Sequence, residues 1–147
     1  MVSGALRSVS ISYSDLSIAF DFVSSAQPSE AEAYISVDTG EIYFVSAAAG
    51  INELPEDDED TSNYISVPHK NELNLGRRLA FNFVDAELPG ESDKVEKFFR
   101  RPGAYGKFKN LLASHGMLEK WYAFEASAVE EALREWCQES GVQLQEA

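Results

Sequence analysis

The segment 94–109 carries the residue types best suited to bind phosphate groups. Basic side chains alternate there with aromatic ones around Pro102 and Gly103, at the junction of two expected helices. Lysine and arginine neutralise phosphates, and an exposed tyrosine can stack on a nucleic-acid base. One hypothesis is therefore a nucleic-acid or phosphate-ligand site. Its residues would be Arg100, Arg101, Lys107, Lys109 and Tyr105.

The same segment also fits two amphipathic helices with buried aromatic side chains. Phe98, Phe99 and Phe108 would then face the core together with Tyr105, and the basic side chains would cover the wet side. The spacing of the aromatic residues favours this packing interpretation over a nucleic-acid site.

A run of five carboxylates offers a second candidate surface. Adjacent negative charges repel one another and provide no apolar surface, so the segment 47–62 is predicted to be a flexible acidic loop. The spaced ligands and the glycine of a calcium loop are missing, and we predict no metal site. A basic protein partner is the functional interpretation that remains. The partner-contact residues would be Glu56, Asp57, Asp58, Glu59 and Asp60.

Catalytic motifs with a local signature do not occur in the chain. The sequence has no P-loop, nucleotide-binding glycine pattern, His-Glu-x-x-His, paired Cys-x-x-Cys or nucleophile elbow. His69 follows a strand-ending proline, and His115 lies in the last turn of an expected helix. We therefore assign no catalytic residue and no cofactor. An enzyme built from dispersed carboxylates, His69 or His115 is the second alternative.

The charge of the chain is strongly negative and unevenly distributed. The net charge is −13, of which residues 1–69 contribute −11, residues 70–120 contribute +3 and residues 121–147 contribute −5. Such a total repels nucleic acid and anionic lipid at long range and favours a basic partner. The charge argues against a protein that coats DNA and leaves room only for a local basic patch.

The cysteine content and the hydropathy favour a cytoplasmic setting. Cys137 is the one cysteine, so no internal disulfide can form, and a reducing compartment is expected. No apolar run has the length of a signal peptide or the roughly 20 residues of a membrane span. We expect no membrane association.

The spacing of apolar residues in the N-terminal half predicts one helix and three strands. Leu16, Ala19, Phe20 and Val23 share a helical face, which predicts a helix near 15–25 that begins after Ser14. The runs rich in β-branched and aromatic residues then predict a three-stranded antiparallel sheet, with a hairpin turn at Asp38-Thr39-Gly40. The expected strands are 33–37, 41–45 and 64–67.

The C-terminal half is predicted to be all helical. Helical periods run from Asn71 to before Pro89, from Ser92 to before Pro102, and from Ala104 to Gly116. Beyond Leu118, Phe124 lies off the apolar face, which predicts a bend there and a separate last helix from about 128 to before Gly141. The fold class is thus α+β with about five or six helices, in a single domain covering 1–147.

The aromatic and glycine positions of the C-terminal half form an ordered pattern. It occupies 103–109, 115–116, 118–124 and 134–141, and strand-like segments lie upstream at 34–41 and 64–68. The pattern resembles an uncharacterised bacterial protein family of unknown function, with the signature Gly-Ala-aromatic-x-x-Phe-Lys, Trp-aromatic-x-Phe and Glu-Trp. The resemblance implies a small bacterial cytosolic protein without an assigned reaction.

The acidic and basic residues lie in separate parts of the sequence, and no set of catalytic residues is recognisable. Together these features favour a non-catalytic interaction or regulatory module. The acidic loop and the basic segment 94–109 are the two expected contact surfaces. A protein partner is the first expectation, nucleic acid is possible but not favoured, and an enzyme is the least favoured class.

Overall fold

The computed structural model describes residues 9–55 and 61–145 of the chain. Contacts between residues divide the chain into two compact units. We call residues 1–73 with 133–147 unit 1, and residues 74–132 unit 2. Each unit is described by itself, and the prediction of a single domain stays a prediction. The mixed α+β fold class is confirmed.

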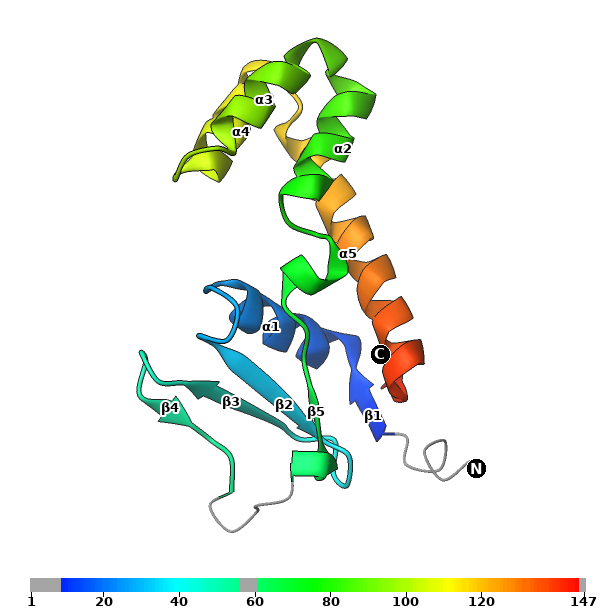
Figure 1. Cartoon of the computed structure of the whole chain (residues 1–147). Coiled ribbons are helices and arrows are strands. Elements are labelled where there is room, and N and C mark those ends of the chain that lie inside the picture. Colours follow the sequence, from blue (N-terminus) through cyan, green and yellow to red (C-terminus); the bar gives the residue numbers. More distant parts are fainter. Residues whose placement is uncertain (1–8, 56–60, 146–147) are drawn as a thin grey trace. The chain divides into compact units, whose positions relative to one another are not determined.

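Unit 1 contains an antiparallel sheet of four strands, in the order β4-β3-β2-β5 (Figure 1). The predicted hairpin and the predicted strand after the acidic run are confirmed. The prediction of three strands was wrong because a two-residue strand, β4, pairs with β3 inside the segment that was expected to be a loop. The strands are β2 Glu32–Ser36, β3 Ile42–Ser46, β4 Ile51–Asn52 and β5 Tyr64–Ser66.

The turn between β2 and β3 depends on Gly40. Its φ of 79° is confirmed as positive, and its N–H donates to the Ser36 carbonyl at 2.8 Å. A Cβ atom at this position would lie 2.9 Å from the Ser10 carbonyl oxygen. Glycine therefore provides both the turn conformation and room for the neighbouring backbone.

Helix α1, Tyr13–Ser24, packs on the sheet of unit 1 (Figure 1). Its N-cap is Ser12 rather than the expected Ser14, and the Ser12 hydroxyl accepts the Asp15 N–H at 3.0 Å. Phe22 of the helix makes an edge-to-face contact with Phe44 of β3, with ring centroids 5.0 Å apart. The four predicted apolar positions are all buried, as expected: Leu16, Ala19, Phe20 and Val23.

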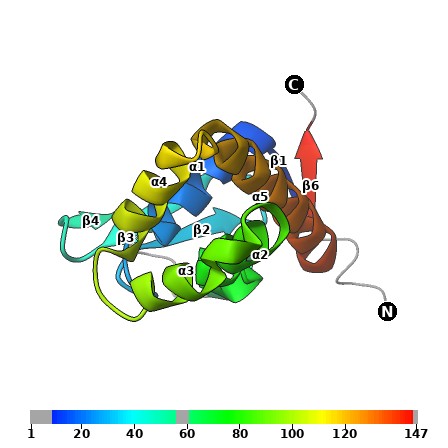
Figure 2. The ribbon, with the colours of Figure 1, turned by 90° about the horizontal axis from the view of Figure 1, so that it is seen from above.

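A second, parallel pair of strands joins sequence-distant parts of unit 1. Strand β1, Val9–Ser12, lies beside β6, Val142–Gln145, with Val9 opposite Val142 (Figure 2). The prediction that the C-terminal half is all helical was therefore wrong at its end. Both valines are buried, which accounts for the pairing of two such short strands.

Unit 2 is helical. It contains α2 Arg77–Glu87, α3 Ser92–Phe98, α4 Ala104–Ser114 and the first part of α5 Leu118–Ser140. The first three helices were predicted, although α2 begins at Arg77 and not near Asn71, because a 3-10 helix and Asn74 at a positive φ of 58° precede it. The expected bend at Phe124 was wrong because α5 is continuous and ends before Gly141. The described residues contain five α-helices in all, together with 3-10 helices at Thr61–Asn63, Lys70–Leu73 and Pro89–Glu91.

Aromatic rings form the core of unit 2. Trp121 and Phe108 are almost fully buried, and their rings meet edge to face with centroids 5.0 Å apart. Phe124 stacks on Trp121 with ring centroids 6.1 Å apart and meets Phe83 with centroids 5.2 Å apart, which explains how it packs within a continuous helix. The indole N–H of Trp121 has no hydrogen-bond partner among the described residues.

Candidate partner-binding site

The structure places the predicted basic residues on the outside of unit 2. Arg100 and Arg101 lie in the turn after α3, and Lys107 lies on α4; all three are exposed. Lys109 lies over the Tyr122 ring, with its Nζ 5.7 Å from the centroid. The bases are therefore on the wet side of the helices, as the packing interpretation expects.

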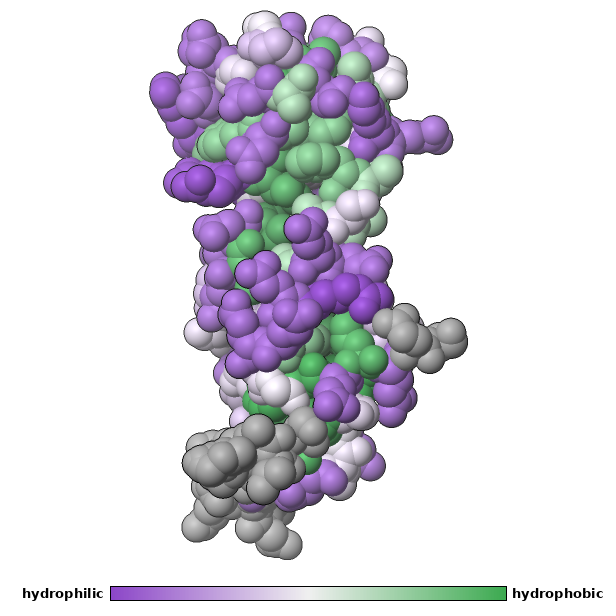
Figure 3. Space-filling model, turned by 90° about the vertical axis from the view of Figure 1, so that its right-hand side faces the viewer, coloured by the Kyte–Doolittle hydropathy of each residue, from purple (hydrophilic) through white to green (hydrophobic). Residues whose placement is uncertain are grey.

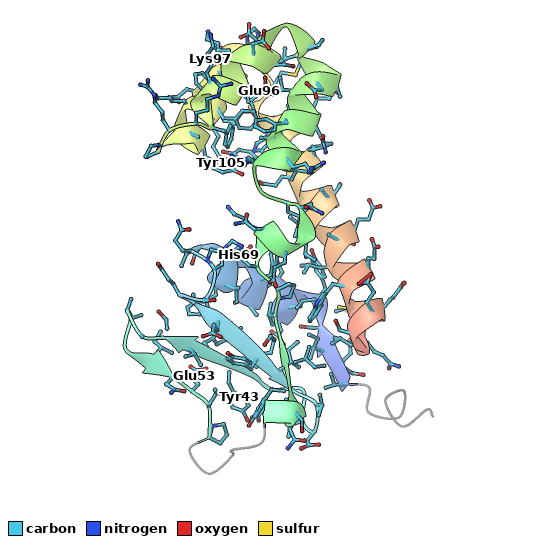
Figure 4. The ribbon with its side chains drawn as sticks, viewed as in Figure 1. Tyr43, Glu53, His69, Glu96, Lys97 and Tyr105 are labelled. Carbon is cyan, nitrogen blue, oxygen red and sulfur yellow. The ribbon has the colours of Figure 1, made fainter. Side chains whose placement is uncertain are left out.

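Tyr105 packs within the aromatic core of unit 2. Its ring meets Phe99 edge to face with centroids 5.0 Å apart, and Figure 4 labels it beside the helices of this unit. Burial, with a smaller effect of the Glu125 charge, raises the pKa of its phenol. Because the ring is partly buried and packs against Phe99, Tyr105 is a poor platform for stacking on a base.

Apolar side chains also reach the surface of unit 2. On the face that Figure 3 shows, green apolar atoms lie between purple polar ones near the top of the view. Tyr122 is 45% exposed, and the Lys109 ammonium lies over its ring, as described above. The long side chains of bases thus cover part of the aromatic surface.

The predicted acidic contact residues lie outside the described residues. Glu56, Asp57, Asp58, Glu59 and Asp60 therefore remain a sequence prediction.

His69 holds segments of unit 1 together through both ring nitrogens. The Asn71 N–H donates to Nδ1 at 3.0 Å, so the proton is on Nε2, which donates to the Ala26 carbonyl at 2.9 Å. His69 is 5% exposed, and its backbone N–H donates to the Glu72 carboxylate at 2.7 Å. This histidine is a structural residue, because neither ring nitrogen remains for a substrate.

His115 and Cys137, the other residues with potential chemistry, also have structural surroundings. His115 is the C-cap of α4, as expected, and its Nε2 lies 3.9 Å from the Glu91 carboxylate. Cys137 is buried in unit 1, and burial raises the pKa of its thiol to about 11, against a smaller opposite effect of the Arg134 charge. A protonated thiol is a weak nucleophile at neutral pH.

An open groove of about 610 Å3 lies between α1 and the beginning of β3 in unit 1. Ile18 of α1 lines it and is 59% exposed; among the described residues, no large apolar side chain is more exposed. Ile42 and Phe44 of β3 add half-buried apolar surface. The groove therefore offers open apolar surface to a ligand or partner.

The rim of this groove is acidic. Asp15 shares a face of α1 with Ile18, three residues away, while Glu41 directly precedes β3 and Glu53 directly follows β4. Figure 4 labels Glu53, which follows β4, and Tyr43, whose hydroxyl donates to Glu41 at 2.7 Å. Lysine and arginine are absent from the lining, so these carboxylates favour a cationic group in the groove.

Sequence reasoning missed this groove. Its residues come from a helix, a hairpin and the chain after β4, and no local spacing brings them together. One signal was present: between Arg7 and Lys70 the chain contains neither lysine nor arginine. A long segment without bases predicts an acidic surface, although not its shape.

Comparison with known proteins gives no relative, because no family model, no curated protein and no solved structure matches the chain. The resemblance to an uncharacterised bacterial family therefore rests on the sequence motifs alone. In residues 9–55 and 61–145, no group of three or more His, Cys, Asp and Glu side chains is arranged to hold a metal ion. Within the same ranges, no helix combines the length and apolar character that crossing a bilayer requires.

Proposed function

We propose that this chain is a non-catalytic interaction module of the cytosol that binds a basic protein partner through unit 1. One observation carries the proposal: the net charge belongs to unit 1 alone. Unit 1 has sixteen acidic and three basic residues, whereas unit 2 has nine of each. Such a field accelerates encounter with a basic partner and repels acidic ones.

The rival proposal is a nucleic-acid or phosphate-ligand binder that uses the segment 94–109. The exposed neighbours Arg100 and Arg101 favour it, since adjacent guanidinium groups can neutralise phosphates. Unit 2 has no excess positive charge, and Tyr105 is engaged by Phe99. These two facts make the basic segment the weaker candidate.

An enzyme with a dispersed carboxylate and histidine site has less support. His69 uses both ring nitrogens within the fold, and His115 lies at a helix end beside Glu91. Neither histidine supports a general base that faces a substrate.

The proposal is tested by capture of partners from a bacterial lysate with three forms of the tagged full-length chain. These are the wild type, Arg100→Glu/Arg101→Glu, and a variant in which exposed carboxylates of unit 1 become amides. We expect a basic protein that the first two forms retain, that salt elutes, and that the third form loses. The amide variant carries Asp15→Asn, Asp21→Asn, Glu30→Gln, Glu41→Gln, Glu135→Gln and Glu139→Gln.

Two outcomes contradict the proposal. Nuclease-sensitive nucleic acid that the wild type holds and Arg100→Glu/Arg101→Glu loses would make the basic segment the site. A partner that all three forms retain equally would show that the charge of unit 1 does not determine binding.

A further inference from the structure

The groove of unit 1 borders an edge of β3 that is not paired along its whole length by the described part of the chain. Strand β4 pairs with β3 only at its end, with Val45 opposite Asn52 and Ser46 opposite Ile51. Continuing this register would place Pro55 opposite Ile42. Proline has no N–H to donate to a sheet, so the pairing ends, and among residues 9–55 and 61–145 no strand pairs with the beginning of β3 on this side.

The hydrogen bonds of the β2–β3 hairpin show which backbone groups face that edge. The Ser36 N–H donates to the Glu41 carbonyl at 2.9 Å, so residue 41 faces β2. In an antiparallel pair this direction alternates along the strand, and the N–H and C=O of Ile42 point away from β2. Ile42 therefore offers one donor and one acceptor at this edge.

The side chains beside this edge differ between the two faces of β3. Phe44 contacts Phe22 of α1, and Ile42 lies on the same face because residues two apart share a side of a strand. The Glu41 carboxylate, bound by Tyr43, lies on the opposite face. The helix side of the edge thus presents the apolar side chains of Ile18, Ile42 and Phe44 with Asp15 at the rim, and Glu41 lies on the other side.

We propose that this edge binds an extended segment of the partner in which apolar and basic residues alternate. The segment would add a strand beside Ile42, with its apolar side chains toward Ile18 and its basic side chains toward Glu41. This inference rests on the proposed function and specifies its site. A second copy of the chain is a poor occupant, because two net charges of −13 repel.

The test measures fluorescence anisotropy of labelled peptides with the full-length chain. One peptide alternates lysine and valine, a second has the same composition in two blocks, and a third is the alternating peptide with N-methylated backbone amides. We expect the alternating peptide to bind about tenfold more tightly than either control. The block peptide cannot place its apolar side chains on one face and its basic side chains on the other, and the N-methylated peptide has no N–H to donate to Ile42. Equal binding of the three peptides would overturn the added strand.

Variants of the chain then locate the site. The groove variant is Asp15→Asn/Glu41→Gln/Glu53→Gln, and its matched control changes the same number of charges outside the groove of unit 1. We expect the groove variant and Ile18→Ser to lose binding of the alternating peptide, whereas the control retains it. Thermal unfolding verifies that each variant folds. The control carries Glu30→Gln, Glu135→Gln and Glu139→Gln, all at exposed positions.

The outcomes separate this inference from the proposed function. If the groove variant and the control lose binding of the alternating peptide equally, the general charge of unit 1 determines binding. This result would overturn the proposal that the groove is the binding site. If the alternating peptide binds no form of the chain, the proposal of a peptide site in the groove is also overturned. The capture experiment decides independently whether unit 1 binds a basic protein.

Discussion

Phe44 and Glu53 are joined by two hydrogen bonds across the edge of the sheet in unit 1. The Glu53 N–H donates to the Phe44 carbonyl at 3.0 Å, and the Phe44 N–H donates to the Glu53 carboxylate at 3.1 Å. A side chain thus accepts the bond that a strand carbonyl would normally accept. The next residue turns away, with the Leu54 N–H donating to the Asn52 side chain at 3.2 Å.

Replacing Glu53 tests whether this carboxylate closes the end of β4. We expect Glu53→Ala to lower the free energy of unfolding by about 1 kcal/mol, because the Phe44 N–H loses its acceptor. Glu53→Gln retains an acceptor oxygen and should lose less. Urea unfolding of the three forms measures the difference, and equal stability of Glu53→Ala and wild type would contradict it.

Loss of the His69 ring should destabilise unit 1 more strongly. His69→Ala leaves the Ala26 carbonyl and the Asn71 N–H without their ring partners, and we expect a loss of about 2 kcal/mol in the free energy of unfolding. His69→Gln can still donate to one of them and should retain part of the stability. A His69→Ala protein that unfolds at the wild-type urea concentration would exclude this structural role.

Strong local patterns predicted the longer elements, whereas pairings between distant residues were not predictable. The face formed by Leu16, Ala19, Phe20 and Val23 correctly predicted α1. Strand β4 has only two residues, and it depends on a turn in which the Gly50 N–H donates to the Ala47 carbonyl. Its formation is decided by the partner strand, because two residues carry no period.

The error in α5 has a different physical cause. The prediction assumed one apolar stripe facing one core, so Phe124, which lies off that stripe, indicated a bend. In the structure, Phe124 packs on Phe83 and Trp121 of unit 2, and Leu133 and Cys137 are buried in unit 1. A helix that contributes to two cores need not show a single stripe.

The candidate site was the least predictable feature. The sequence indicated an acidic surface and a basic segment, but it could not show that Ile18 remains exposed beside Ile42. Ile18 lies off the buried face of α1, which accounts for its exposure, whereas its position beside Ile42 depends on the tertiary fold. Hydropathy alone would assign both isoleucines to the core.

Cys137 should react slowly with alkylating reagents at neutral pH. Its thiol has a pKa of about 11, against 9.0 for an ordinary thiol, so very little thiolate is present. We expect alkylation by iodoacetamide to accelerate toward pH 11 in the folded chain, and to be fast in the urea-unfolded control. Arg134→Gln should slow it further, since the Arg134 charge favours the thiolate. Neutral reactivity equal to the unfolded control would contradict the burial of Cys137.

Tyr34 should ionise late and should make the fold sensitive to alkali. Its hydroxyl donates to the Glu32 carboxylate, and this bond, with burial and the Glu32 charge, raises its pKa from 10.0 to about 12. Because the pKa of the folded state lies above that of the unfolded chain, the stabilising contribution is complete below pH 10. It is lost as the pH rises through 12.

Tyrosinate absorbance measures this ionisation, and the difference between wild type and Tyr34→Phe isolates it from the other tyrosines. We expect a midpoint near pH 12 that moves toward 10 in Glu32→Gln, because the amide removes the negative charge beside the phenolate. Tyr34→Phe should also lose less stability than wild type between pH 10 and 12. A difference titration already centred at pH 10 in the wild type would mean that Glu32 does not hold the Tyr34 hydroxyl in solution.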